Sequence, residues 1–302
     1  MSLWIPVTIA AASFQTVRFM LQKVLSTATL SPAGATFARF AWSMPLILLG
    51  LAVYLGVSGR SLPDLSATFW MFAAIGGTAQ ILATVCVVAL FKQRNFAVGI
   101  TFKKTEVIQT AIVGLVVLGD AISAWGWAAI GIGLAAVLVL SKPSEGGGDV
   151  AWWRHLSNRA SRLGLGSGVL FAFSAVSYRG ASLELAELEP AFRAAVTLAA
   201  VVSLQACSMA LWLAWRDRAQ LAAVWASRRV GLWVGLTSMG GSFCWFLAFT
   251  LQNAAYVKAL GQVELLFSLV ASVLFFREKI SGREVLGMGL LGLSILALVL
   301  AI

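Results

Sequence analysis

The side chains best placed for chemistry are ionisable groups inside long apolar stretches. Lys103, Lys104 and Glu106 lie well inside the apolar run 96–118. An ionisable side chain at the centre of a lipid bilayer costs about 2.5–3.5 kcal/mol, and such groups usually serve a function. Lys103 and Glu106 share a helical face, whereas Lys104 points about 100° away. Two lysines against one carboxylate leave a positive surplus, which favours a pocket for an anionic substrate; the alternative is a Lys–Glu pair that only neutralises itself.

A second buried carboxylate, Glu264, lies near the middle of the run 254–276. Three functional interpretations stay open: a counter-ion for Lys103 or Lys104, a proton carrier that couples transport to protons, or a ligand for a substrate amine. The structural alternative is an ion pair with a basic residue of another helix. Lys258 stands close to the start of the same run, so snorkelling of its amine to the membrane surface is the favoured interpretation.

Four arginines, Arg18, Arg39, Arg179 and Arg193, each lie a few residues from the end of an apolar run. Each could reach the headgroups by snorkelling or could line a mouth of a transport pathway. Arg18 shares its helical stripe with polar residues, and Arg39 and Arg193 are each followed four residues later by a hydroxyl. These features favour a cationic lining at both mouths.

Polar side chains also form stripes on two further runs. Gln80 and Thr84 are four residues apart on the third run, and Ser238 and Ser242 hold the matching places on the eighth, with Trp245 next. A polar stripe on a membrane helix faces protein or a water-filled cavity. Substrate lining and helix–helix hydrogen bonding are both open for these side chains, as are substrate stacking and core packing for Trp245.

Other kinds of site are disfavoured. The chain has one histidine and three cysteines without a CxxC pair, so the sequence predicts no metal site, no disulfide framework and no cofactor. The G-x-G-x-x-G of residues 287–292 lies inside an apolar run with no strand before it, so it does not indicate a dinucleotide fold. No nucleophile motif accompanies the carboxylates, and we predict no catalytic residue and no enzyme.

These side chains must be positioned by membrane helices. Of 302 residues 60% are apolar and 11% charged, against about 25% charged in a soluble domain. The net charge of +10 comes without a basic block, so we expect no nucleic-acid partner. Each apolar run is long enough to span a bilayer as a helix. The runs fall at about 3–22, 34–57, 67–91, 96–118, 121–141, 163–183, 190–215, 230–251, 254–276 and 284–302.

The runs form two halves. The polar stretch 142–162 separates residues 1–141 from residues 163–302, with five predicted helices on each side. A shift of 158 superimposes Glu106 on Glu264 without a gap over the surrounding stretch, whereas matching Arg39 to Arg193 needs a shift of 154. Because each half has an odd number of spans, the second enters the membrane inverted. The prediction is an all-α integral membrane protein of ten transmembrane helices in two inverted repeats, an architecture typical of transporters.

The sequence resembles the drug/metabolite transporter superfamily, in its branch with two EamA-type repeats. The resemblance rests on the 5+5 arrangement, on Arg39, Arg193, Glu106 and Glu264, and on the residues 275–281 with Gly287, which are similar to a family turn. Residues 118–123 carry a weaker version. The proline usual after the fourth-helix glutamate is absent. The resemblance implies a transporter in the bacterial inner membrane, with export as the family tendency.

We therefore predict a secondary transporter that moves a small polar metabolite by alternating access through a central cationic cavity. The cationic surplus favours a carboxylate substrate, an amino acid or organic acid; a phosphorylated or lipid-linked substrate is the first alternative. A non-transporting membrane scaffold or assembly protein is the alternative of another class. The sequence predicts lipid and a small molecule as partners and leaves the oligomeric state open.

The orientation follows from the loop charges. The odd-numbered loops hold 14 Lys or Arg residues, whereas the even-numbered loops hold only Arg60. Because cytoplasmic loops carry the excess of Lys and Arg, this count places the 142–162 stretch in the cytoplasm and both termini outside. Proteins of the resembling family are more often expected with both termini inside, so the charge count and the family disagree.

Overall fold

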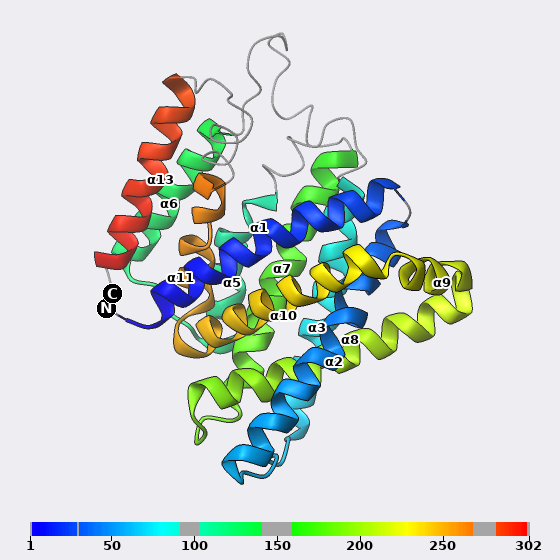
Figure 1. Cartoon of the computed structure of the whole chain (residues 1–302). Helices are drawn as coiled ribbons and strands as arrows, with labels where there is room; N and C mark the ends of the chain where they lie inside the picture. Colours follow the sequence, from blue (N-terminus) through cyan, green and yellow to red (C-terminus); the bar gives the residue numbers. More distant parts are fainter. Residues whose placement is uncertain (1, 29, 91–102, 141–158, 268–281, 301–302) are drawn as a thin grey trace.

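The computed structural model describes residues 2–28, 30–90, 103–140, 159–267 and 282–300 (Figure 1). Within these ranges every regular element is a helix. The helices are α1 (Trp4–Ala28), α2 (Pro32–Ser58), α3 (Ala67–Leu90), α5 (Glu106–Leu118), α6 (Ala124–Leu140), α7 (Arg159–Leu183), α8 (Pro190–Arg216), α9 (Arg218–Ala226), α10 (Arg228–Leu251), α11 (Ala254–Leu260) and α13 (Gly282–Leu300).

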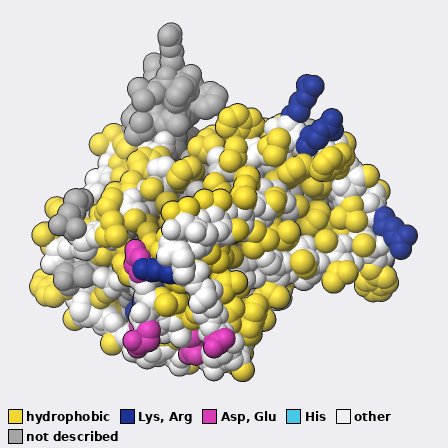
Figure 2. All heavy atoms as spheres, turned by 60° about the horizontal axis from the view of Figure 1, so that its bottom comes forward, with side chains coloured by type: hydrophobic (Ala, Val, Ile, Leu, Met, Phe, Trp, Pro, Cys, Tyr) yellow, Lys and Arg dark blue, Asp and Glu magenta, His cyan; other side chains and the backbone are white. Residues whose placement is uncertain are grey.

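Five of these helices, α2, α3, α7, α8 and α10, are long and apolar enough to cross a membrane, and Glu106–Leu118, Ala124–Val139 and Val285–Leu300 are shorter apolar helices. Their outer faces expose apolar side chains: Val57 is 86% and Leu211 73% exposed. Figure 2 shows hydrophobic side chains over most of one face, with Lys and Arg along its right-hand edge and Asp and Glu near its lower edge. The chain is a multi-pass membrane protein.

Helices from the two halves of the chain pack against each other. The most extensive pairs are α3 with α7, α1 with α10 and α6 with α13, followed by α2 with α10 and α5 with α7. In Figure 1, α6 and α13 stand together at one side, and α9 projects at the other. Groups carried by α1, α2 and α3 therefore face groups carried by α7, α10 and α11 in the middle of the molecule.

The two glutamates follow interruptions in helical hydrogen bonding. Lys104 and Thr105 form a turn directly before α5, which begins at Glu106. After α11, Gln262 N donates to Ala259 O at 3.2 Å and Glu264 N donates to Gly261 O at 3.2 Å. These are bonds of the tighter 3₁₀ type, which within a longer helix often mark a functional position. Both carboxylates thus lie where the helical ladder is broken rather than in a regular span.

Candidate functional site

A small cavity lies between α1, α2, α3, α7, α10 and α11. Three of its lining side chains are basic, Arg18, Arg39 and Lys258, and none of the described residues that line it is acidic. We call it the cationic cavity. Its volume is about 20 Å³, which is room for about one water molecule. The sequence-predicted residues Gln80, Ser242 and Trp245 also line it.

Arg39 is held by hydroxyl groups from two other helices. Its Nε donates to Ser238 Oγ at 3.0 Å, one terminal nitrogen donates to Thr84 Oγ1 at 3.3 Å, and the other donates to Ser242 Oγ at 3.3 Å. The side chain is only 3% exposed. The guanidinium of α2 is therefore fixed by α3 and α10, and all three partners are neutral.

Arg18 has a comparable environment. It donates to Gln15 Oε1 at 3.4 Å, and its guanidinium lies 4.8 Å from the centre of the Phe19 ring. Gln15 in turn donates to Glu264 Oε2 at 2.8 Å. Within the described part of the chain neither Arg18 nor Arg39 forms an ion pair. The cavity thus contains two buried guanidinium groups whose hydrogen-bond partners are neutral.

Beside the cavity, three lysines and two glutamates form a network. Lys103 Nζ and Lys258 Nζ lie 3.7 Å and 3.8 Å from the same oxygen of Glu106, and Lys104 pairs with Glu264. Lys104–Glu264 is the counter-ion arrangement that the sequence left open. All five side chains are buried, with Lys258 only 8% exposed.

The snorkelling interpretation of Lys258 is wrong. Its amine lies 4.9 Å from the centre of the Trp245 ring and 5.4 Å from that of Phe171, at the wall of the cavity. The ring faces and Glu106 together supply the attraction that holds the ammonium inside. Position in the sequence shows only how far Lys258 lies from the start of its run, whereas the orientation of α11 decides where the side chain goes.

Sequence reasoning missed Tyr178, which is part of the neutral wall of the cavity, and Gln205, which bonds to wall residues from outside the lining. Tyr178 donates to Gly76 O at 3.1 Å and stacks on Phe246 with ring centres 4.3 Å apart. Gln205 donates both to Tyr178 Oη at 3.2 Å and to Gln80 Oε1 at 2.9 Å. The signal that could have found them is the occurrence of Tyr178 and Gln205 within otherwise apolar runs.

Arg179 and Arg193 lie outside the cationic cavity. Arg179 forms a two-pronged pair with Asp120 at 2.7 Å and 3.3 Å and donates to the carbonyls of Phe249 and Gln252. Arg193 donates through Nε to Ser182 O at 2.9 Å. These contacts tie the end of α7 to the α5–α6 turn, to α10 and to α8. Of the four predicted pathway arginines, the structure places Arg18 and Arg39 in the cavity wall and the other two in this second group.

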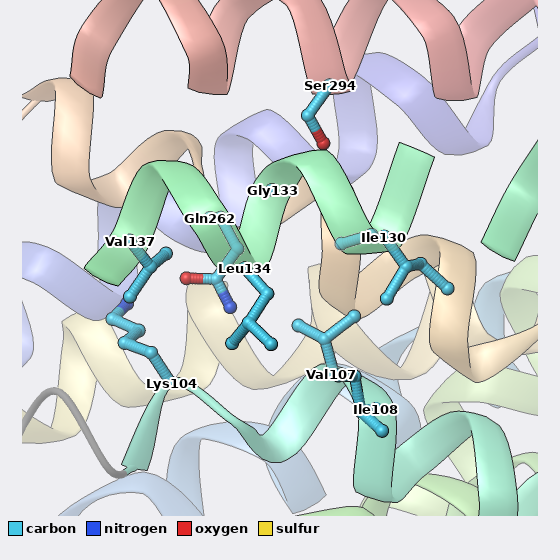
Figure 3. A pocket seen from close by; sticks show the side chains of 10 residues that line it. Lys104, Val107, Ile108, Ile130, Gly133, Leu134, Val137, Gln262 and Ser294 are labelled. Atoms are coloured by element: carbon cyan, nitrogen blue, oxygen red, sulfur yellow. The ribbon is translucent and has the colours of Figure 1, made fainter. Parts of the chain in front are cut away.

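A second cavity of about 10 Å³ lies between α5, α6, α11 and α13. Figure 3 shows the side chains of Lys104 and Gln262 entering the same narrow space beside Leu134 and Val137. Ser294 turns away to donate to Ala129 O at 2.7 Å. Lys104 is the one basic residue in the described lining of this space, and it already pairs with Glu264, so the candidate site is the cationic cavity with its lysine–glutamate network.

Comparison with known proteins adds the family. Residues 160–300 match the model of the EamA-like transporter family. This stretch, which lies in the second half of the chain, is similar to EamA-like transporters. The resemblance seen in the sequence is thereby confirmed, and EamA-like proteins are membrane transporters of small molecules. Several solved structures match; one of them, a crystal structure, is 15% identical with a TM-score of 0.64, over 97% of this chain and 99% of that chain, which shows a shared fold. No curated protein matches the sequence.

Of the two turns that resemble the family pattern, the weaker one, at residues 118–123, lies within the described residues. Gly119 ends α5 with φ +68°, and the N–H groups of Gly119 and Asp120 donate to Leu115 O and Gly114 O. Only glycine adopts this backbone conformation at little cost. The turn delivers Asp120 to Arg179. Residues 275–281, and residues 142–158 of the predicted linker, lie outside the described residues.

Proposed function

We propose that this EamA-like protein carries a small anionic metabolite across the membrane by alternating access, with Arg18, Arg39 and Lys258 as the groups that bind the anion. The observation that carries the proposal is the pair of buried guanidinium groups at the cavity, whose hydrogen-bond partners among the described residues are all neutral. A buried charge without a counter-ion is costly. An anionic substrate would supply the missing charge.

The chemistry of the groups favours a carboxylate. Arginine offers a planar fork of donors that matches the two oxygens of a carboxylate or phosphate. The aromatic side chains of Phe171, Trp245 and Phe249 around Lys258 leave apolar walls for the rest of the substrate. An amino acid or organic acid comes first, and a phosphorylated compound, whose oxygens suit the same fork, is the alternative within transport.

The sequence prediction assigned the substrate anion to Lys103 or Lys104. In this structure both amines lie against carboxylates, so we propose that they act in the same site as part of a charge network that rearranges when the anion binds. Glu264 contacts both Lys104 and, through Gln15, Arg18. A proton taken up by Glu264 would free Lys104, which makes Glu264 the proposed coupling residue.

Alternating access by inverted repeats needs two halves of similar structure. The helix lengths in the two halves of this chain agree. The helices α1 and α7 have 25 residues each, α2 and α8 have 27 each, and α3 and α10 have 24 each. The breaks before Glu106 and Glu264 fall at matching places, and the family match covers residues 160–300. We propose two inverted five-helix repeats with ten spans, joined by residues 142–162.

The alternative of a non-transporting scaffold predicts a solid, fully ion-paired core. The cationic cavity is too small for a metabolite, so its volume alone does not favour transport. Its two arginines do favour transport, because neither has a carboxylate partner among the described residues and a scaffold gains nothing from buried cations that lack counter-ions. We interpret the arrangement as a closed state of the carrier.

For orientation in the proposed bacterial inner membrane we retain the charge count. Around the α8–α10 connection, Arg216, Arg218, Arg228 and Arg229 lie at one end of the membrane helices, and Glu184, Glu187 and Glu189 follow α7 at the other. The rule that cytoplasmic loops are basic places the α8–α10 connection and residues 142–162 inside, with both termini outside.

A binding screen tests the proposal. The purified protein is heated with a panel of amino acids, organic acids, phosphate esters and matched neutral compounds, and unfolding is followed by intrinsic fluorescence. A ligand that binds the folded state raises the midpoint. We expect at least one anion to raise it and its amide or ester analogue to have no effect. Stabilisation by neutral analogues alone would contradict the anion site.

A further inference from the structure

The short helix α9 lies between the membrane helices α8 and α10, and together with the adjoining ends of those two helices it carries a concentration of basic and aromatic side chains. Residues 216–229 contain Arg216, Arg218, Arg228 and Arg229 and one acidic residue, Asp217. All four arginines are exposed. Trp215 and Trp225 are 84% and 65% exposed. We call these four arginines and two tryptophans the α9 surface.

The opposite side of α9 is anchored to the protein. Val224 is buried, and Leu221 packs against the hydrophobic core. Gln220 Oε1 accepts a hydrogen bond of 2.9 Å from Ser31 N, immediately before α2. A helix with an apolar face toward the core and a basic, tryptophan-containing face outside is typical of helices that lie in the membrane interface.

A second contact leads from α9 to the cationic cavity. The Trp225 ring stacks on Trp42 of α2, with ring centres 5.6 Å apart and an interplanar angle of 21°. Trp42 fits against Gly231 and Gly235 of α10, where a Cβ atom would overlap it. Arg39 lies three residues before Trp42, on a neighbouring part of the same helical face. Through this stack, α9 contacts the segment of α2 that presents Arg39 to the cavity.

We propose that the α9 surface binds the headgroups of anionic phospholipids, and that this contact holds α2 in the position that presents Arg39 to the cavity. The arginines supply the charge complementary to the phosphates, and the exposed tryptophans have the amphipathic rings that lie at headgroup level. Anionic lipid attracts basic residues near the bilayer surface. The geometry makes phospholipid composition a regulator of anion binding.

The first arm of the test measures lipid binding without any substrate. The full chain is purified with phosphatidylglycerol or phosphatidylcholine, and retained lipids are counted by native mass spectrometry. The variant Arg228→Gln/Arg229→Gln is compared with Arg159→Gln/Arg162→Gln, which removes the same charge from exposed positions of α7. We expect the first pair to weaken phosphatidylglycerol retention at least about tenfold and the second to change it less than threefold. Equal retention of both lipids by the native protein, or equal losses in the two variants, would overturn the proposal.

The second arm tests the coupling to α2, and it rests on the proposed anion site. Trp42→Ala removes the stack on Trp225 and leaves every residue of the α9 surface in place. It should retain phosphatidylglycerol like the native protein, while phosphatidylglycerol no longer strengthens binding of the anion found in the screen. If the lipid strengthens anion binding equally with and without Trp42, the coupling is wrong. Failure of anion binding in the native protein would count against the proposed function and leave the first arm's result standing.

Discussion

Replacing Arg39 with glutamine should separate anion binding from stability. The substitution removes a guanidinium that is 3% exposed and bonded only to Ser238, Thr84 and Ser242. Each hydrogen bond to a charged group contributes about 1.5–3 kcal/mol, but burying the unpaired cation costs several kcal/mol. These opposing quantities nearly cancel, so the unfolding midpoint of the ligand-free protein should stay the same or rise.

Anion binding should respond to Arg39→Gln much more strongly than the unfolding midpoint does. Truncating one partner of a buried charge pair costs about 2–5 kcal/mol, which corresponds to a dissociation constant about 30-fold to several thousand-fold larger. The anion found in the screen is titrated into the purified native and Arg39→Gln proteins, and both Kd and the unfolding midpoint are measured. Arg39→Lys keeps the charge but not the fork, and should fall between the two.

Arg193→Gln is the matched control. It removes another buried arginine, but one that bonds to a main-chain carbonyl outside the cavity. Its Kd should stay within about twofold of the native value, because ion–ligand contacts act over short distances. A native-like Kd for Arg39→Gln would refute the anion role. A large fall in the ligand-free midpoint of Arg39→Gln would show that Arg39 serves the fold instead.

Three further predictions concern the network and the orientation. Lys103→Met and Lys104→Met keep bulk and remove charge, so each should reduce the transport rate at least about tenfold by disturbing charge-assisted contacts; native rates in both would exclude a role in the site. Glu264→Gln removes the proposed proton carrier, so transport should lose its pH dependence while anion binding persists; an unchanged pH profile leaves Glu264 with a structural role only. In intact cells, on a background without native cysteines, an impermeant thiol reagent should miss a cysteine at Gly147 and label one at Glu187, and the opposite labelling would reverse the orientation.

Much of the helical architecture could be predicted from the sequence, because hydrophobic run length is a direct physical requirement of a bilayer. The predicted run 34–57 corresponds to α2 and the run 190–215 to α8. The resemblance to EamA-type transporters came from the motif residues, and the family match over residues 160–300 agrees with it. Boundaries shifted where polar residues continue a helix past its apolar part, as in α1, which extends to Ala28.

The site could be predicted only in part. Spacing along one helix shows which side chains share a face, so Lys103 and Glu106 were paired correctly. Spacing does not show how separate helices are rotated about their axes, and that rotation brings Arg18, Arg39 and Lys258 to one cavity.

Arg193 shows that sequence spacing also misleads when residues of the two proposed repeats are matched. The helices α2 and α8 begin at Pro32 and Pro190, an offset of 158 that places Thr197 opposite Arg39. Matching the two arginines required an offset of 154, which the helix starts do not share. Arg193 accordingly bonds to Ser182 at the end of α7 instead of entering the cavity.

Transport in a purified system tests the central claim most directly. The native protein and Arg39→Gln are reconstituted into separate liposomes, and uptake of the radiolabelled anion found in the screen is followed with time. Alternating access through the cationic cavity predicts saturable uptake by the native protein, competed by unlabelled anion, and uptake near that of protein-free liposomes with Arg39→Gln. Binding of the anion by the native protein without uptake above protein-free liposomes would contradict the account.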